Sequence, residues 1–391
     1  MSNSIATREN AIMVAGAVKA KAPILQFVNK ELSGEFKNGN GSTVDALVPS
    51  YGVVTEGEAI GDTTVSIESI PVTVTVANTA AALGIVERSL AIDDFDAQVA
   101  KPRGAKLAAY INEKIYKAGL YAAEYSVVST GSFAQLATAI AYVEGSRIDG
   151  MKAGMLNPQF KAIVTNSGIS QFGNSSLAGQ LYEGLIGEFN GAEFISSVDA
   201  KVISTGWVPT SGSTVSTTVS ANDAYQITIA DAGLTSANSV KAGTQFKVAD
   251  VYAVDAFGDS TGVLRTFIAI EDATAGTGTV VVKVAPLYFS GAKKNCSANI
   301  VAGKAVPTSL EANSVYYTGL VFNENAITFA SAVIKPFAGC DSSTTKIEGE
   351  INVRMSAQAD LSAGSETVRW DILTGAKAVH GKAIAAMYVK A

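Results

Sequence analysis

The sequence predicts an α+β protein, and three patterns along the chain point to this fold class. Apolar and polar residues alternate in many short runs, which is the period of β-strands. One segment that begins near Pro102 instead carries apolar residues at the spacing of a long amphipathic helix. A third segment, about 208–303, is rich in Thr, Ser, Val and Gly without helical periodicity, which predicts an all-β insertion in a mixed α and β chain.

The chain begins with a predicted helical arm. Residues 11–18 are mostly apolar and Lys19 follows at once, so we expect an amphipathic helix that ends before Pro23. The same stretch fits the core of a signal peptide poorly, because Glu9 stands where that signal requires positive charge. No other segment approaches the roughly 18 apolar residues of a membrane span. We therefore expect a soluble protein that is made in a cytoplasm.

Residues 42–78 predict a long β-hairpin, which follows a break rich in Gly and Asn at 34–41. Pro71 lies inside the second strand and cannot donate a ladder hydrogen bond, which indicates an exposed edge or a bend. The alternating apolar positions are Val44, Ala46 and Val48 in the first strand and Val72, Val74 and Val76 in the second.

Two helices follow the predicted hairpin. The first begins near Pro102 and extends to about Tyr125, which corresponds to a length on the order of 35 Å. Its apolar stripe consists of Leu107, Ile111, Ile115, Ala118 and Ala122. The second helix begins after Ser132, because Ser132 and Gln135 have the spacing of a capping box, and we expect it to end near Gly145.

The rest of the chain is predicted to be mainly β-structure. Residues 156–160 indicate a turn, and the apolar residues 162–165 predict a short strand after it. Within the Thr- and Val-rich segment, three alternating runs predict strands at 225–229, 266–270 and 279–284. Further strands are predicted at 326–330, 349–355 and 382–389.

Composition argues against catalysis and against nucleic-acid recognition. The 391 residues are 48% hydrophobic and only 16% charged, with a net charge of -6, which excludes a disordered or strongly basic protein. His380 is the single histidine, so the usual catalytic base and imidazole metal ligands are almost absent. We assign no catalytic, cofactor-binding or metal-binding residue, and we expect no enzymatic activity.

Several short motifs suggest chemistry, but each has a simpler structural explanation. Two acidic groups do not match the spacing of a calcium loop, and we expect solvated loops or inter-subunit contacts; they are Asp93, Asp94 and Asp96, and Asp250, Asp255 and Asp259. Residues 38–41 lack the Gly-Lys-Ser/Thr of a phosphate loop, and Gly276 and Gly278 indicate a turn between strands. His380 has no nucleophile elbow to serve, so we expect a structural or exposed position.

The remaining reactive residue types carry little information. The two cysteines, Cys296 and Cys340, allow one bridge at most, and buried free thiols in a reducing compartment are the favoured interpretation. The sequons at Asn40, Asn174 and Asn295 are expected by chance in a chain rich in Asn and Ser.

The order arm helix, long hairpin, long helix and α/β region resembles the major capsid protein of tailed bacteriophages, which has the Hong Kong 97-like fold. Three phrases are similar to the podophage coat subfamily, whose members carry an inserted β domain. Leu156-Asn157-Pro158-Gln159-Phe160 is similar to a turn of these proteins, and Phe322-Asn323-Glu324-Asn325-Ala326-Ile327, with Pro336 beyond it, resembles the strand after their insertion. Residues 367–375, TVRWDILTG, resemble their last core strand and its turn.

The resemblance implies a domain organisation. It comprises an N-terminal arm at 1–35, an extended hairpin loop at 36–80, a peripheral domain with the long spine helix at 81–155, a peripheral and apical α/β core at 156–207 and 304–391, and the inserted all-β domain at 208–303. It also implies a structural virion protein without cofactors, which self-assembles into pentamers and hexamers of an icosahedral shell around double-stranded DNA. Scaffolding and portal proteins would be its partners, the DNA would be bound without sequence specificity, and the shell would assemble in the host cytoplasm without a membrane.

Elementary physics is consistent with an assembly role. A two-stranded hairpin of about 35 residues cannot bury both faces by itself, so it needs the surface of a neighbour. Low charge density favours large contacts between subunits, because few charges must be desolvated. Two alternatives stay open at this point: a nanocompartment shell that encloses an enzyme cargo, similar to encapsulins, and a surface-layer or adhesin-like β protein.

Overall fold

The structure is a computed structural model that describes residues 2–36, 42–49, 51, 67–83, 95–169, 187–338, 340–347, 351–360, 362 and 365–391. The chain forms two compact units, which we describe separately. Unit 1 contains Met1–Ala46, Pro71–Ile115 and Thr328–Lys377, and unit 2 contains Leu47–Ile70, Tyr116–Ile327 and Ala378–Ala391. The mixed helices and strands of both units confirm the α+β class.

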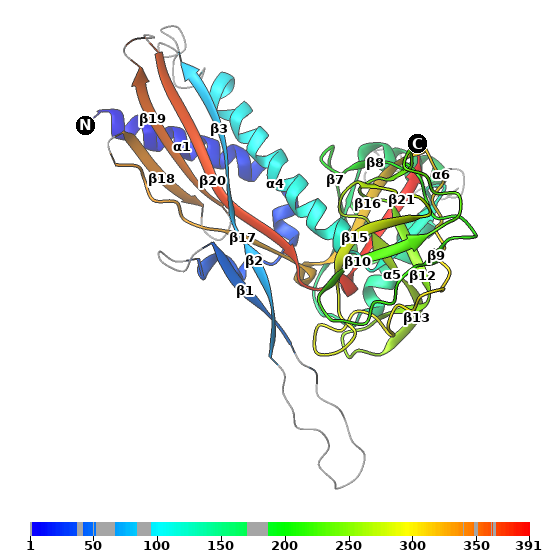
Figure 1. The fold of residues 1–391 in the computed structure, drawn as a ribbon. Coiled ribbons are helices and arrows are strands. Elements are labelled where there is room, and N and C mark those ends of the chain that lie inside the picture. The colour runs from blue at the N-terminus through cyan, green and yellow to red at the C-terminus, as the bar shows by residue number, and fades with distance from the viewer. Residues whose placement is uncertain are drawn as a thin grey trace. The chain divides into compact units, whose positions relative to one another are not determined.

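The sheet of unit 1 is organised around one long strand, β20 (Ser365–Ala378). It pairs antiparallel with β3 (Thr75–Leu83) and with β19 (Ile351–Asp360) (Figure 1). β18 (Asp341–Ile347) extends the sheet beyond β19, and β17 (Ile327–Ser331) pairs with β20. Trp370 in β20 is fully buried and lies in register with Thr79 and Met355 of the two neighbouring strands.

The N-terminal arm begins with α1 (Ser2–Lys21), so the predicted helix that ends before Pro23 is confirmed. Four of its residues are buried at helical spacing, which gives the helix an apolar face against β18 and β19; they are Ala11, Val14, Ala15 and Val18. Two short 3₁₀ turns follow, η1 (Pro23–Phe27) and η2 (Glu31–Gly34). Between them Asn29 forms a parallel bridge with Thr328, which joins the arm to the start of β17.

The described ends of the predicted hairpin form a two-stranded ribbon of β1 (Thr43–Val48) and β2 (Glu68–Thr73). β2 runs almost without a break into β3, so one extended segment belongs first to the ribbon and then to the sheet of unit 1. Val72 and Val74 are buried as predicted, whereas Val76 is exposed. Pro71 lies within β2, which is an edge strand of this ribbon, in agreement with its missing donor.

The longest predicted helix is confirmed as α4 (Lys101–Ala122), which continues a π-helical turn, η3 (Asp96–Ala100). Its 22 residues correspond to a length of about 33 Å. Leu107, Ile111 and Ile115 are buried as predicted. Asn112 does not belong to the predicted apolar stripe but is also buried, and its side chain donates a hydrogen bond to the Lys21 carbonyl at the end of α1 (3.2 Å).

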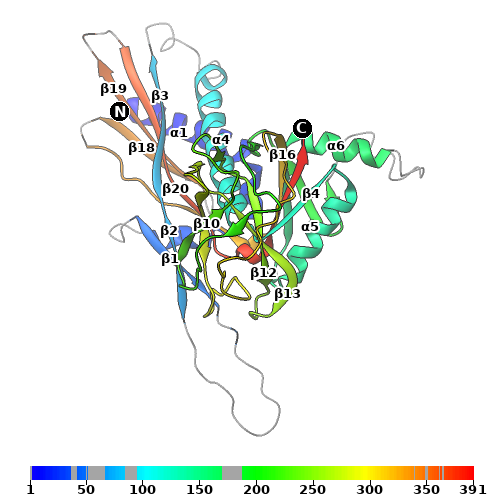
Figure 2. The same cartoon turned by 45° about the vertical axis from the view of Figure 1, so that its right-hand side comes forward.

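The central sheet of unit 2 is built around β16 (Val315–Asn323). It pairs antiparallel with β21 (Ile384–Lys390), with β5 (Lys152–Leu156) and with β8 (Val202–Ser204). Beyond β21 lies β4 (Tyr125–Ser129), in parallel. Beyond β5 the described part of the sheet is completed by the parallel strand β7 (Ala192–Ser196) and the antiparallel strand β6 (Glu188–Phe189). Figure 2 shows β16 and β4 of this sheet.

Two helices accompany this sheet. α5 (Phe133–Gly145) packs on β4, β16 and β21, and its predicted N-terminus is confirmed because the Ser132 hydroxyl accepts a hydrogen bond from the Gln135 amide (3.4 Å). The Gln135 side chain does not complete the capping box, because its Oε1 accepts no hydrogen bond from the Ser132 amide, while its Nε2 donates to the carbonyls of Val127 and Tyr388. α6 (Pro158–Ile169) packs on α5 and β16.

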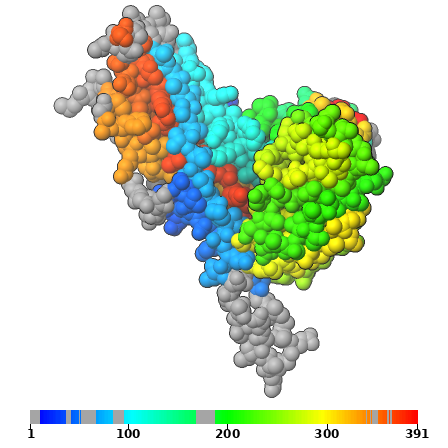
Figure 3. Space-filling model, in the orientation of Figure 1, coloured from blue at the N-terminus to red at the C-terminus, as the bar shows by residue number. Residues whose placement is uncertain are grey.

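Between β8 and β16 the chain forms only strands among its regular elements. β9 (Thr214–Val215), β10 (Ala224–Ala230) and β15 (Thr279–Leu287) form one sheet; β11 (Ser239–Val240) pairs with β14 (Ala273–Thr274), and β12 (Gln245–Val254) pairs with β13 (Ser260–Ile268). Buried apolar side chains from residue 215 to residue 306 form a shared core, which includes Ile227, Phe246, Phe267 and Val282. In Figure 3 the surface atoms of this segment are among those coloured green to yellow.

Three local predictions were wrong. Residues 162–165 lie in α6 and not in a strand, because Pro158 occupies the first turn and the Asn157 side chain accepts a hydrogen bond from the Gln159 amide (3.0 Å), which starts a helix. The phrase 322–327 is not one strand, since η4 (Glu324–Ala326) separates β16 from β17. The Asn323 side chain caps this turn through the Asn325 amide (2.9 Å).

The third error concerns Gly375, where a turn was expected after the strand with Trp370. β20 instead continues to Ala378. A β-carbon on Gly375 would collide with the Thr73 carbonyl, so the glycine allows close backbone approach and does not turn the chain. The final strand of the chain is β21, preceded by the short turn η5 (Gly381–Ala383).

No helix within the described residues has the length and apolar character to cross a membrane.

Candidate assembly site

The hairpin ribbon is closed on its unit 1 side by polar contacts. The Val74 amide donates to the Ser42 carbonyl (2.8 Å), and the hydroxyl groups of Thr43 and Thr73 lie 3.0 Å apart. Farther along the ribbon, the apolar side chains of Leu47 and Ile67 are 68% and 77% exposed. A two-stranded ribbon buries few side chains by itself, so these two exposed aliphatic side chains are available for contact with another chain.

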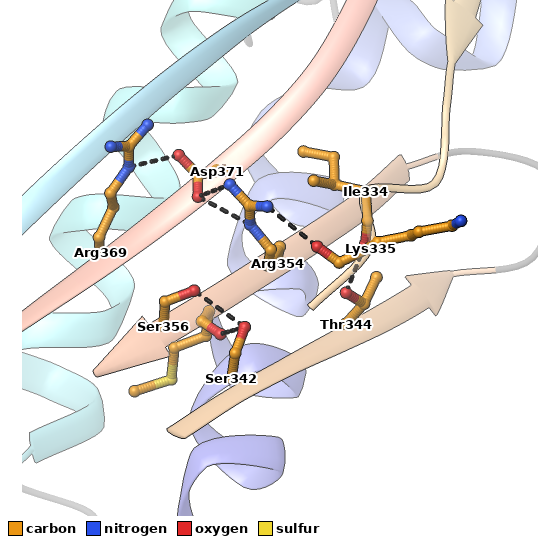
Figure 4. A network of polar contacts seen from close by, with 9 residues as sticks. Ile334, Lys335, Ser342, Thr344, Arg354, Ser356, Arg369 and Asp371 are labelled. Carbon is orange, nitrogen blue, oxygen red and sulfur yellow. Dashed lines mark hydrogen bonds and ion pairs between the residues drawn. The ribbon is translucent and has the colours of Figure 1, made fainter. Parts of the chain in front are cut away.

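A buried ion pair stabilises the sheet that receives β3. Asp371 in β20 is fully buried, and one of its oxygens accepts hydrogen bonds from Nε and Nη2 of Arg354 in β19 (3.0 and 2.8 Å) (Figure 4). Its other oxygen accepts from Nε of Arg369 (2.6 Å). Arg354 also donates to the Lys335 carbonyl (2.9 Å), and its guanidinium lies 3.8 Å from the centre of the Phe337 ring.

These contacts fix the chain segment that follows β17. Arg354 holds the Lys335 carbonyl, and the Thr344 hydroxyl of β18 donates to the neighbouring Ile334 carbonyl (2.7 Å) (Figure 4). The Ser342 and Ser356 hydroxyl groups lie 2.9 Å apart and link β18 to β19. The segment from 332 to 337 therefore depends on side chains of two strands for its position.

A second charged cluster lies inside unit 2, where strands of the Thr- and Val-rich segment meet the central sheet. Glu124, which precedes β4, and Arg265 of β13 are both buried, with Oε1 and Nη2 3.9 Å apart. The Thr266 amide donates to the Glu124 carbonyl (2.9 Å), and Nη1 of Arg265 lies 2.7 Å from the Cys296 sulfur. Lys382 of η5 donates to the carbonyl of Asp255 (3.0 Å).

Burial dominates the titration of this cluster. Desolvation raises the pKa of Glu124 to about 7, although the positive charges of Arg265 and Lys382 act in the opposite direction. Burial lowers the pKa of Lys382 and raises that of the Cys296 thiol. For His380, burial first and the Lys382 charge second lower the pKa to about 4. Glu124 and His380 can change charge with pH, but the contacts given above connect strands and turns of unit 2 and therefore have a structural role.

The acidic groups that suggested cation binding have other partners. Asp250 forms an ion pair with Lys304 (2.5 Å), and Asp255 forms one with Arg147 (3.2 Å). The Asp259 amide donates to a carboxylate oxygen of Asp255 (2.9 Å), so these residues shape a turn. Asp96 pairs with Lys101 at the start of α4 (2.7 Å). Asp93 and Asp94 lie outside the described residues.

The cysteines, the turn at Gly278 and the side chain of Asn295 all lie among the described residues. Cys296 and Cys340 are free, and Cys296 is buried. Gly278 has a φ of +78° and stands between β14 and β15, so the predicted turn is confirmed. The Asn295 side chain bonds to two backbone groups, the Tyr288 amide and the Pro286 carbonyl. Residues 38–41, with Asn40, and Asn174 lie outside the described residues.

No motif in the sequence marks Glu124, Arg265, Arg354 or Asp371. Charged residues within runs of apolar and small residues were the only available signal, for instance Arg354 and Asp371 in predicted strands. Their pairing is invisible in the sequence, because Glu124 and Arg265 are 141 positions apart and meet only through the tertiary fold.

Comparison with known proteins gives a family match over the second half of the chain. The family described as "P22 coat protein - gene protein 5" matches residues 202–387, a span from β8 to β21 that includes β9–β15 and the central strand β16. No curated protein matches the chain.

Solved structures with a similar chain path share little sequence with this protein. A chain of Mycobacterium phage Che8 is 10% identical, with a TM-score of 0.49 and coverage of 94% of this chain and 90% of its own. The capsid structure of the cyanophage P-SCSP1u is 11% identical, with a TM-score of 0.41 and coverage of 93% and 86%. A virus-like particle from Pyrococcus furiosus is 7% identical, with a TM-score of 0.43 and coverage of 97% and 98%.

Proposed function

We propose that this chain is a tailed-phage major capsid protein of the Hong Kong 97-like class, with a segment of the P22 coat type at residues 202–387, and that it builds an icosahedral shell from pentamers and hexamers around double-stranded DNA. The family match is the observation that carries this proposal, because its span includes both the Thr- and Val-rich strands and the core strands β16 and β21. It is a structural virion component and not an enzyme.

The proposal assigns a role in assembly to each part of the chain. Residues 1–35 are the N-terminal arm, 36–80 the extended hairpin loop, 81–155 the peripheral domain with its spine helix, and 156–207 with 304–391 the peripheral and apical core. Residues 208–303 are the inserted all-β domain. The separate apolar core of β9–β15 and the ribbon of β1 and β2 support these assignments.

The hairpin carries the contact between subunits in this proposal. Its exposed side chains Leu47 and Ile67 need a cover, and a neighbouring copy of the same chain supplies one in a closed shell. We further propose that scaffolding and portal proteins take part in assembly, which proceeds in the host cytoplasm. The net charge of -6 suits a container whose lining holds packed DNA without gripping it or selecting its sequence.

Shortening the hairpin tests this role. Residues 52–66, the predicted tip, are replaced by a short Gly-Ser linker, which leaves every contact described for Tyr51 and Ile67 onward in place. We expect electron microscopy to show closed shells for the wild-type protein and none for the variant, which should sediment as unassembled subunits.

A folding control makes this result decisive. Circular dichroism and thermal unfolding of the unassembled variant should match those of unassembled wild-type protein, since the replaced segment lies beyond the described strands. Closed shells from the shortened variant would refute the hairpin assignment. Wild-type protein that stays unassembled under all conditions, with and without a scaffolding protein, would refute the shell proposal itself.

What the purified particles contain distinguishes a phage shell from a compartment that encloses an enzyme. Particles recovered from infected cells should contain nuclease-protected DNA. A stoichiometric enzyme inside them, identified by mass spectrometry, would contradict the phage assignment and favour a nanocompartment.

A further inference from the structure

Two loops of unit 2 are held in shape by side-chain hydrogen bonds to their own backbone. The first, the 255–259 turn between β12 and β13, is organised by Asp255, whose Oδ1 accepts hydrogen bonds from the Phe257 and Asp259 amides (3.0 and 2.9 Å). The Asp255 amide in turn donates to the Asp259 carbonyl (2.9 Å). Arg147 pairs with the other oxygen of Asp255 at 3.2 Å. Phe257 therefore projects from a turn that one buried carboxylate holds in shape.

The second loop, the 288–295 loop after β15, is closed by Asn295. Its side chain accepts from the Tyr288 amide (2.8 Å) and donates to the Pro286 carbonyl (3.0 Å). Within this loop the Lys294 amide donates to the Gly291 carbonyl (3.2 Å). The Lys294 ammonium group donates to the carbonyl of Gly258 (3.0 Å), which ties this loop directly to the 255–259 turn.

Each loop contacts one side of the hairpin, the first at Tyr51 beyond β1 and the second at Glu68 and Ser69 in β2. On the outgoing side, the ring of Tyr51 meets Phe257 edge to face, with centroids 5.2 Å apart, while the Arg147 guanidinium lies 5.1 Å from the Phe257 ring. On the returning side, Oε2 of Glu68 accepts a hydrogen bond from the Lys293 amide (2.7 Å). The Lys293 ammonium group donates to the Ser69 carbonyl (3.4 Å).

Gly291 makes the second contact possible. Its φ of +84° favours glycine, and a β-carbon at this position would collide with the carboxylate of Glu68. The loop is thus shaped to receive the Glu68 carboxylate against its backbone. A carboxylate that accepts from a backbone amide forms one of the stronger types of hydrogen bond.

We propose that these two loops form a cradle for the root of the hairpin, by which we mean Tyr51 and Glu68–Ser69, the residues on either side of 52–66. Glu68 and Tyr51 are then positioning residues that set the direction in which the hairpin leaves its own subunit. The inference rests on the proposed shell function, which it deepens. A two-stranded ribbon alone is marginally stable and free to swing. Two anchors, one on each strand and joined to each other through Lys294, restrict that swing before assembly and lower the ordering cost of docking on a neighbour.

The test uses full-length unassembled protein and the variant Glu68→Ala. Hydrogen exchange of a peptide that covers residues 67–73 measures how firmly the returning strand is held. We expect exchange in this peptide to become about tenfold faster and the yield of closed shells to fall, with an unchanged thermal unfolding midpoint. The matched control is Glu271→Ala, which removes a carboxylate that pairs with Lys283 instead (2.7 Å); it should leave both measurements unchanged.

A second variant keeps the test independent of Glu68 itself. Gly291→Ala should reproduce the faster exchange, because the new methyl group displaces the Glu68 side chain. In the Glu68→Ala background the same substitution should keep only the effect of backbone strain at a φ of +84°, because the carboxylate it would displace is gone, so the two effects should be less than additive. Additive effects of the two substitutions, or unchanged exchange in both single variants, would overturn the cradle.

The outcomes distinguish this inference from the proposed function. Wild-type shells combined with unchanged exchange in Glu68→Ala would reject the cradle and leave the shell function intact. Faster exchange in a protein that never forms shells would support the cradle as a structural feature and reject the assembly role that we give it.

Discussion

Glu124 shows how a single residue links folding to pH in this protein. It is buried beside Arg265, and desolvation raises its pKa to about 7 from an ordinary value of 4.5. Between these two pH values the folded protein holds a proton that the unfolded chain has released. The stability that this proton contributes is therefore fully present below about pH 4.5 and is lost as the pH rises through 7.

The variant Glu124→Gln should remove this dependence. The difference in the free energy of unfolding, variant minus wild type, should increase by on the order of 2 kcal/mol between pH 5 and pH 8. The reason is that the wild type must ionise a buried carboxyl group over this range and the variant has none. Urea unfolding at several pH values measures the difference. Glu144→Gln, at an exposed carboxylate that pairs with Lys152, is the control and should show a flat difference. A flat difference for Glu124→Gln as well would contradict the expected titration.

His380 acts in the opposite direction. Its pKa falls to about 4 because burial and, to a smaller extent, Lys382 disfavour the charged ring. Between pH 6.5 and pH 4 the unfolded chain therefore binds a proton at His380 that the folded protein does not bind. The stability that the neutral His380 ring contributes is present above pH 6.5 and is lost as the pH falls through 4.

His380→Gln should accordingly lose less stability than wild type between pH 7 and pH 4, by on the order of 2 kcal/mol. Comparing the two proteins cancels the contribution of Glu124, which both retain. Parallel acid unfolding curves for the two proteins would show that protonation of the half-buried His380 ring does not destabilise the folded protein in acid.

At the scale of elements, the sheet of unit 1 depends on the ion pair between β19 and β20. Asp371 is fully buried and serves two arginines, whereas the Arg369 side chain is 42% exposed. Asp371→Asn should destabilise the unassembled subunit by about 3 kcal/mol, because Arg354 would remain buried without its counter-charge. Arg369→Gln, the control at the same carboxylate, should cost less than about 1 kcal/mol since solvent screens that pair.

Denaturant unfolding followed by circular dichroism provides both values. Equal losses for the two variants would mean that burial of Arg354 does not determine the strength of the pair.

Local sequence patterns predicted elements well where one physical signal acted alone. The apolar stripe of α4 and the Ser132 cap of α5 were sufficient, because helical spacing and capping are decided within a few residues. The strand predicted at residues 162–165 was wrong because a short apolar run fits a helix and a strand equally well. The Asn157 cap starts a helix here, and these residues continue it. Gly375 misled because glycine serves both turns and close backbone contacts.

At the scale of the whole molecule, the predicted order of elements was informative because it depends only on the succession of local signals. Arm helix, hairpin, long helix and Thr- and Val-rich strands all follow in the expected order among the described residues. That order, with three short phrases, indicated the capsid class to which the family match at 202–387 also points.

The sequence by itself determined the fold class, the long helix, the described strands of the hairpin and the absence of a recognisable catalytic motif, because periodicity, capping and composition are local properties. Only the tertiary structure decided which charges are buried together and what holds the hairpin at its root. Glu68 and Lys293 are 225 positions apart, and many other contacts in this protein also join segments that are distant in the sequence. No local pattern encodes such a contact, since its energy depends on burial and geometry that arise only when distant segments fold together.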